Sequence, residues 1–169
     1  AKLMHVATLG YRPSLAVSEA LRDYLSGYGL LLTGDPGIGK TMLMRLLLGV
    51  GRIYTCESIV AGGFAGLKVL REFTDGAEIC IDDLGAEAVS NQYGAKDDLL
   101  KSFIASRSEQ QKAVTHITTN LTAAQIVQRY GDRTLSRILG MCRPHKFVGV
   151  NQRKAVATGD ESKTKGNVI

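Results

Sequence analysis

The chain has 169 residues, of which 44% are hydrophobic and 22% charged, and this length and composition are typical of one globular domain that buries roughly two-thirds of its unfolded surface. The apolar stretches 30–32 and 42–50 are far below the roughly 20 residues that span a bilayer, and the N-terminus does not resemble a secretion signal, so we expect a cytoplasmic protein. The net charge of +5 is compatible with nucleic-acid phosphates, and equally with a surface that only maintains solubility.

Apolar spacing and turn residues predict helices and strands that alternate along the chain. The predicted helices span 14–25, 40–48, about 65–73, 97–107, 122–130 (capped by Thr122) and 132–139. The predicted strands span 30–33, 52–55, 78–81, 113–118 and 146–150. This alternation favours right-handed crossovers and a parallel sheet covered on both faces. The predicted fold class is therefore α/β.

The predicted domain organisation has three parts: an N-terminal segment with one helix (1–28), the α/β domain (29–150) and a C-terminal tail (151–169). The tail is rich in Gly, Ser, Thr and Lys without apolar periodicity, so we expect it to be mobile. The three cysteines include no CxxC pair and are expected to be reduced thiols. Cys142 and His145 have the spacing of half a zinc site, but no second ligand pair accompanies them.

The pattern GxxxxGK[ST] follows the predicted strand 30–33 and begins a helix, as Gly34-Asp35-Pro36-Gly37-Ile38-Gly39-Lys40-Thr41. Its glycines let backbone N–H groups approach a triphosphate closely, and the helix N-terminus adds partial positive charge. Lys40 would neutralise the β- and γ-phosphate oxygens, and Thr41 would ligate Mg²⁺. A glycine-rich turn before a buried helix would not explain the Lys-Thr pair. The segment therefore predicts a phosphate-binding loop for ATP and Mg²⁺.

Two carboxylates follow the apolar strand 78–81, at the sheet edge where ligands bind in open α/β folds. Asp82 would hold Mg²⁺, usually through water, and Asp83 would orient or deprotonate the attacking water. An Asp-rich turn after a strand would explain the pair if it occurred alone. Its position after a phosphate-binding loop favours a Walker B motif.

Polar residues after the strand 113–118 are further candidates for the site. The strand would lie beside the phosphate-binding strand and place the Asn120 amide near the γ-phosphate or the attacking water; alternatively, Asn120 is part of a turn before the next helix. Arg133 and Arg137 are four residues apart on one face of a predicted helix. Arginine suits bidentate contact with phosphate oxygens, although a solvated helix face would show the same pattern.

The motifs together resemble the AAA+ ATPases of the DnaC-like helicase loader and IstB-like transposition families. The similarity spans about residues 29–150 and is carried by the runs 81–87 (IDDLGAE), 118–122 (TTNLT), 129–133 (RYGDR) and 135–138 (LSRI). The resemblance implies a five-stranded parallel sheet in the order 5-1-4-3-2, with helices on both faces. An Asp-Asp pair is usual in this branch, where most AAA+ proteins have Asp-Glu.

By position, the resemblance makes Asn120 the sensor 1 residue, Arg133 the sensor 2 counterpart, which would contact nucleotide, and Arg137 an arginine finger offered to a neighbouring subunit. Family members couple ATP and single-stranded DNA to the loading of a replicative helicase or to transposase targeting, so self-assembly on nucleotide binding is expected. Tyr93 lies in the polar loop that faces DNA in this family, where it would stack on a base; alternatively, it packs beneath its own loop.

The family also carries features that this sequence matches less well. Loaders and initiators have additional helical structure in the region that corresponds to 55–78, and this region is short here. Loaders also have a separate N-terminal module that holds the helicase, and the segment before the phosphate-binding loop is too short for such a module. Two other functions fit the first two motifs: a P-loop kinase that phosphorylates a small molecule or nucleotide, and a module that binds ATP without turnover. The Thr-Thr-Asn segment and the paired arginines favour the DNA-linked ATPase.

Overall fold

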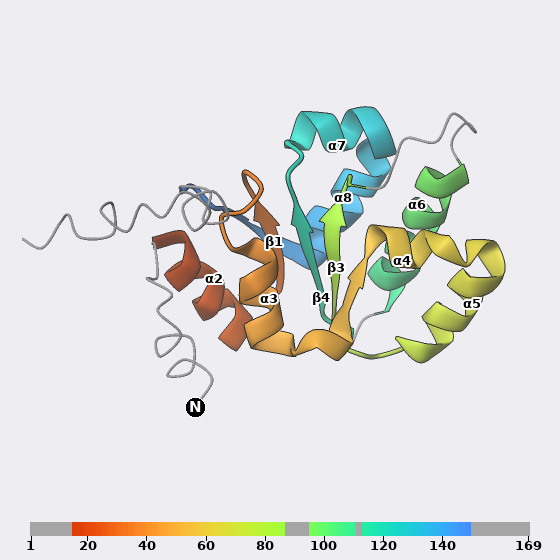
Figure 1. Cartoon of the computed structure of the whole chain (residues 1–169), viewed down its shortest axis with the longest axis horizontal. Coiled ribbons are helices and arrows are strands. Elements are labelled where there is room, and N and C mark those ends of the chain that lie inside the picture. The colour runs from red at the N-terminus through yellow and green to blue at the C-terminus, as the bar shows by residue number, and fades with distance from the viewer. Residues whose placement is uncertain (1–14, 87–94, 111–112, 150–169) are drawn as a thin grey trace, which may run out of the picture.

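The computed structural model describes residues 15–86, 95–110 and 113–149, and Figure 1 shows their arrangement. The helices are α2 (Leu15–Leu25), α3 (Lys40–Leu48), α4 (Cys56–Ala61), α5 (Gly63–Phe73), α6 (Ala95–Glu109), α7 (Ala123–Tyr130) and α8 (Asp132–Met141), with a 3-10 turn η1 (Val50–Arg52). The strands are β1 (Gly29–Thr33), β2 (Ile53–Thr55), β3 (Ile79–Leu84), β4 (Thr115–Thr119) and β5 (Cys142–Lys146). None of the described helices is long and apolar enough to cross a membrane.

The five strands form one parallel sheet in the order β2-β3-β4-β1-β5. This order is the predicted 5-1-4-3-2 read from the other edge, so the predicted fold class and strand order are confirmed. β1 lies between β4 and β5, and its Thr33 is in register with Thr119 of β4 and Lys146 of β5. The end of β1 therefore has a neighbouring strand end on each side.

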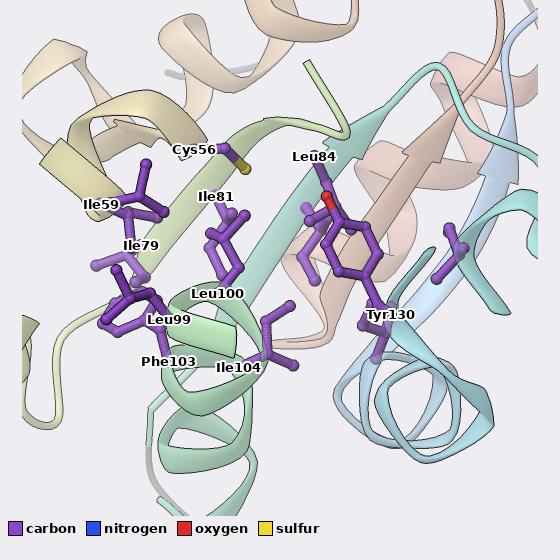
Figure 2. Packing of buried hydrophobic residues seen from close by; sticks show 14 of the residues in the cluster. Cys56, Ile59, Ile79, Ile81, Leu84, Leu99, Leu100, Phe103, Ile104 and Tyr130 are labelled. Atoms are coloured by element: carbon purple, nitrogen blue, oxygen red, sulfur yellow. The ribbon is translucent and has the colours of Figure 1, made fainter. Parts of the chain in front are cut away.

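The handedness of the crossovers explains which helices cover which face. Only the connection from β1 to β2, through α3, runs towards the β2 edge; the other connections run towards β5. Right-handed crossovers therefore place α3 on one face and α4 to α8 on the other. The core follows this division, because Leu30 and Leu32 pack with residues of α2 and α3, whereas Leu31 packs with residues of α4 to α8. Figure 2 shows the cluster on the face covered by α4 to α8, with Leu100, Phe103 and Ile104 of α6 near β3.

A buried arginine organises the N-terminal edge of the sheet, opposite the ends of the strands that carry the predicted motifs. Arg107 is 1% exposed, and desolvation lowers the pKa of its guanidinium. All five of its N–H groups donate hydrogen bonds, to Thr115 Oγ1, Thr74 O, Gln110 Oε1, Ala77 O and Val114 O. Because each donor has a partner, the charge can be buried without an unsatisfied polar group. Arg107 thereby joins α6 to the starts of β3 and β4.

The structure corrects the predicted bounds of two strands and adds a helix that we did not predict. The last strand is Cys142–Lys146 rather than 146–150, because the polar residues that lie beside β1 form an edge strand with no strong apolar alternation. β3 continues through Asp82 and Asp83 to Leu84, whereas we predicted its end at residue 81. Helix α4 was missed, although Thr55 caps it by accepting a hydrogen bond from the Ser58 backbone N–H.

Candidate nucleotide-binding site

The GxxxxGK[ST] segment forms the loop between β1 and α3, and its backbone requires glycine. Gly34, Gly37 and Gly39 have φ angles of 133°, 82° and 97°, in the region that L side chains rarely adopt. A Cβ atom at Gly34 would also lie 2.3 Å from the carbonyl oxygen of Phe147. Gly39 is the N-cap of α3 and provides no side-chain cap, so the backbone donors of the first helical turn remain suited to an anion.

The loop lysine connects this segment to the end of β4. Lys40 is 5% exposed, and its Nζ donates hydrogen bonds to Gly34 O at 2.6 Å and Asp35 O at 2.8 Å. Nζ also donates to Asn120 Oδ1 at 2.7 Å. The two residues are brought together because β4 pairs with β1 and both chain segments leave the sheet at the same edge. Asn120, the predicted sensor 1 residue, is thus hydrogen-bonded to the lysine of the loop.

The first carboxylate after β3 lies against the start of α3. Asp82 is 3% exposed, and its Oδ1 accepts hydrogen bonds from Thr41 Oγ1 at 2.9 Å and Thr118 Oγ1 at 2.6 Å. Among the residues that the structure describes, no basic side chain forms an ion pair with this carboxylate. Burial raises the pKa of the nearby Cys80 thiol, and the negative charge of Asp82 raises it further. The Asp82 carboxylate beside Thr41 is thus a group that would stabilise a cation.

The second carboxylate has an unusual backbone. Asp83 has a φ angle of 55° and is the sole non-glycine with positive φ among the described residues. The register between β3 and β4 shifts here, because Ile81 pairs with Ile117 and the next pair is Leu84 with Thr119. Two residues of β3 therefore lie opposite the single residue Thr118, which is the arrangement of a β-bulge. Bulges of this kind redirect a side chain at the end of a strand.

The segment that follows the bulge is held by the end of β4 and by α7. Thr119 Oγ1 donates a hydrogen bond to Leu84 O at 2.6 Å, and Arg129 Nη1 donates one to Gly85 O at 2.7 Å. The Leu121 side chain packs so closely on Gly85 that a Cβ atom there would be 2.5 Å from Leu121 Cδ1. Sequence reasoning assigned no role to Thr118, Thr119 or Arg129, since a Thr-rich strand end and a helix arginine are ordinary features of sequences.

The two predicted arginines lie on α8, away from these contacts. Helix α8 begins at Asp132, with Gly131 as its N-cap, and ends where β5 starts, at the N-terminal edge of the sheet. Arg133 is exposed and lies nearer the C-terminal edge of the sheet than the half-buried Arg137, by about 6 Å along the helix axis. Neither forms a hydrogen bond or ion pair with another described residue. Tyr93 lies outside the described residues.

The half zinc site suggested by Cys142 and His145 has other partners. Cys142 Sγ donates a hydrogen bond to Thr115 O at 3.1 Å, and burial raises the pKa of its thiol to about 12. His145 Nε2 lies 3.1 Å from Asp23 Oδ2. Among the described residues, no group of three or more His, Cys, Asp or Glu side chains could hold a metal ion. Cys56, Cys80 and Cys142 are all buried free thiols.

Comparison with solved structures gives matches that include a helicase loader and a DNA replication initiation factor. The structure of the DnaC helicase loader matches with a TM-score of 0.63 and 24% identity, covering 82% of this chain and 94% of that one. DnaI matches with a TM-score of 0.65 and 20% identity, covering 82% and 88% of the two chains. AMPPCP-bound DnaA from Aquifex aeolicus matches with a TM-score of 0.57 and 14% identity, and the shared region covers 94% of this chain and 55% of DnaA.

No protein-family model matches the chain, and no curated protein matches it in sequence. Together with the strand order and the loop between β1 and α3, the structural matches show that the fold is that of an AAA+ P-loop NTPase. The predicted resemblance to the DnaC-like helicase loaders is confirmed at the level of the fold.

The residues of the loop and of β3 fit a nucleotide with Mg²⁺. The glycines with positive φ angles keep side chains out of the loop, so that its backbone can approach a phosphate closely. Thr41 and Asp82 supply a hydroxyl and a carboxylate in direct contact, and Mg²⁺ prefers hard oxygen donors of this type. A buried carboxylate without an ion pair is also typical of a metal-binding residue.

Proposed function

We propose that this protein binds and hydrolyses ATP with Mg²⁺, and that its ATP cycle is coupled to single-stranded DNA. Its cellular role would be helicase loading in DNA replication or assistance to a transposase. The observation that carries this proposal is the 2.7 Å hydrogen bond between Lys40 Nζ and Asn120 Oδ1, together with the 2.9 Å contact between Thr41 and Asp82. These contacts join the phosphate-binding loop to two further strand ends, which a glycine-rich turn of purely structural function would not require.

The side chains at these strand ends have separate roles in the proposed reaction. Mg²⁺, when bound, would supply positive charge to offset the negative charge that develops during phosphoryl transfer. Thr41 and Asp82 would hold this ion, and Lys40 would bind the β- and γ-phosphate oxygens. Asp83 would orient the attacking water and accept its proton. The Asn120 amide, which lies beside Lys40 Nζ, would align the water or the γ-phosphate.

Arg133 and Arg137 would complete the charge around the γ-phosphate. Arg133 lies nearer the phosphate-binding edge of its own subunit, which supports a sensor 2 role in cis. Arg137 lies one helical turn further along α8, and we assign it to the nucleotide of a neighbouring subunit. Because Arg137 has no described hydrogen-bond or ion-pair partner within its own chain, a contact in an assembly would not have to replace an existing one. Nucleotide binding would therefore promote self-assembly.

Single-stranded DNA would bind near the loop after β3, where Tyr93 is the proposed stacking residue. Gly85 begins this loop and accepts a hydrogen bond from Arg129, which connects the segment to α7. The end of β4 contacts both this segment and Lys40, so it is a physical connection between the proposed DNA loop and the proposed nucleotide site. The protein partner would be a replicative helicase or a transposase.

A steady-state ATPase assay with and without single-stranded DNA tests this proposal. We expect slow basal hydrolysis that DNA stimulates, and Lys40→Ala provides the matched inactive control. Phosphate transfer from ATP to an added small molecule, independent of DNA, would instead identify a kinase. Tight ATP binding without turnover under either condition would identify a module that uses ATP as a structural ligand. A pull-down with replicative helicase and with transposase would then identify the partner.

A further inference from the structure

We infer that Thr118 is a positioning residue for the proposed ATP hydrolysis, because its single hydroxyl holds both Asp82 and Asp83. The inference rests on the proposed function, since it assigns Mg²⁺ to Asp82 and the attacking water to Asp83. Thr118 is fully buried and would contact neither ATP nor Mg²⁺ itself. It acts through the two carboxylate residues of β3.

The geometry of the hydroxyl supports two simultaneous hydrogen bonds. Thr118 Oγ1 donates to Asp82 Oδ1 at 2.6 Å and accepts from the backbone N–H of Asp83 at 2.9 Å. A hydroxyl has one hydrogen to donate and two lone pairs that accept, so both bonds can exist at once. A valine at this position would preserve the shape of the side chain and remove both bonds.

The β-bulge explains why these bonds need a side chain. Asp82 and Asp83 together lie opposite Thr118, so the regular ladder between β3 and β4 is interrupted at this point. The extra residue in a bulge leaves backbone groups without their usual partner on the neighbouring strand. Here the Thr118 hydroxyl accepts from the Asp83 N–H in place of a backbone carbonyl. It therefore stabilises the positive φ angle that directs the Asp83 side chain.

The same hydroxyl fixes the rotation of the Asp82 carboxylate. Thr41 and Thr118 both donate to Oδ1, from α3 and β4 respectively. Within the described part of the chain, the other carboxylate oxygen of Asp82, Oδ2, accepts no hydrogen bond. It is also not one of the fully buried polar atoms that lack a partner. This oxygen is thus available for a metal ion or its water. Residues that orient a metal-binding carboxylate in this way typically change metal affinity or activity by about 10- to 100-fold when they are replaced.

The test compares Thr118→Val with Thr118→Ser, which keeps the hydroxyl. The first measurement is Mn²⁺ binding, by electron paramagnetic resonance, to protein saturated with a non-hydrolysable ATP analogue. The second is kcat and KM for ATP. For Thr118→Val we expect Mn²⁺ affinity to fall about tenfold and kcat to fall about 10- to 100-fold, with KM changed less than about threefold. Thr118→Ser should remain within about threefold of the wild type in both measurements.

Thr74→Val is the matched control. Thr74 is 1% exposed and its hydroxyl donates to Leu70 O, but it lies at the opposite edge of the sheet. This variant also loses a buried threonine hydroxyl, but one that contacts neither Asp82 nor Asp83. Its Mn²⁺ affinity and kcat should therefore remain near those of the wild type. A loss in both variants would show a general effect of destabilisation and would overturn the assignment. If Thr118→Val does not fold, Thr118→Ala removes the same hydroxyl with a smaller side chain.

If Thr118→Val binds Mn²⁺ and hydrolyses ATP as the wild type does, the inference is refuted and the proposed function is unaffected. Failure of the wild-type protein to bind the analogue would refute the proposed function itself, and the inference with it. A wild-type protein that binds the analogue and Mn²⁺ but does not hydrolyse ATP would remove the hydrolytic role. In that case Mn²⁺ affinity alone would decide whether Thr118 positions Asp82.

Discussion

The left-handed backbone of Asp83 leads to a prediction that separates its conformation from its chemistry. With a φ angle of 55°, this position suits aspartate and asparagine, whose short polar side chains tolerate the region better than longer ones do. The left-handed conformation costs an ordinary L-residue about 1 to 2 kcal/mol. Asp83→Glu should therefore destabilise the fold by about 1 kcal/mol, whereas Asp83→Asn should leave its stability nearly unchanged.

For a chain of this length, about 1 kcal/mol corresponds to a decrease in Tm of roughly 2 to 4 °C. The rate of ATP hydrolysis should show the opposite pattern, because Asp83→Asn keeps the stability but loses the activity. Asp83→Asn removes the base but keeps the shape, so ATP should still bind while hydrolysis falls by about 10²-fold or more. Asp83→Glu keeps a carboxylate, although its extra methylene and the strained backbone move that group from its native position.

The assays are thermal denaturation followed by circular dichroism without nucleotide, calorimetric titration with ATP, and steady-state hydrolysis. A Tm for Asp83→Glu equal to that of the wild type would show that the positive φ angle does not constrain this position. An asparagine variant that loses as much stability as the glutamate variant would contradict the conformational argument. An asparagine variant that hydrolyses ATP at the wild-type rate would contradict the proposed role of the carboxylate.

Three further predictions concern the other proposed site residues. Lys40→Ala should greatly weaken or abolish ATP binding in calorimetry, because the only side-chain cation of the loop is lost; an unchanged Kd would exclude its proposed role. Arg137→Ala should bind ATP and fold normally but lose about 10³-fold or more of turnover, and mixing it with Asp83→Asn should restore part of the rate. No recovery in mixed assemblies that are shown to form would refute action in trans. Tyr93→Ala should weaken single-stranded DNA binding about tenfold at constant ATP affinity, as fluorescence anisotropy can measure, and unchanged DNA affinity in the folded variant would refute base stacking.

The sequence predicted those features that short stretches of chain determine. The bounds of α3, 40–48, agree with the structure because a glycine-rich loop precedes it and Gly49 follows it. The predicted cap at Thr122 is present as a full capping box with Gln125, since all of its groups belong to one helical turn. Alternation of strands and helices was also sufficient for the α/β class, because parallel strands require crossover connections.

The boundaries of β5 and the bulge in β3 depend on neighbours far along the chain. β5 is an edge strand whose Arg143 and Lys146 are exposed, so its pairing with β1, rather than its own periodicity, decides which residues belong to it. The bulge at Asp82 and Asp83 likewise arises from the pairing of β3 with β4. Neither interaction leaves a pattern that a sequence window can detect.

The sequence by itself determined which residues could bind phosphate and metal, because the loop motif and the Asp-Asp pair each lie within a few consecutive residues. Only the tertiary structure decided how they are joined: Lys40 to Asn120, and Asp82 to both Thr41 and Thr118. These contacts exist because a parallel sheet brings the C-terminal ends of strands that are distant in sequence to one edge. The role of Thr118 follows from that register, since its hydroxyl is placed opposite the bulge only when β3 and β4 pair.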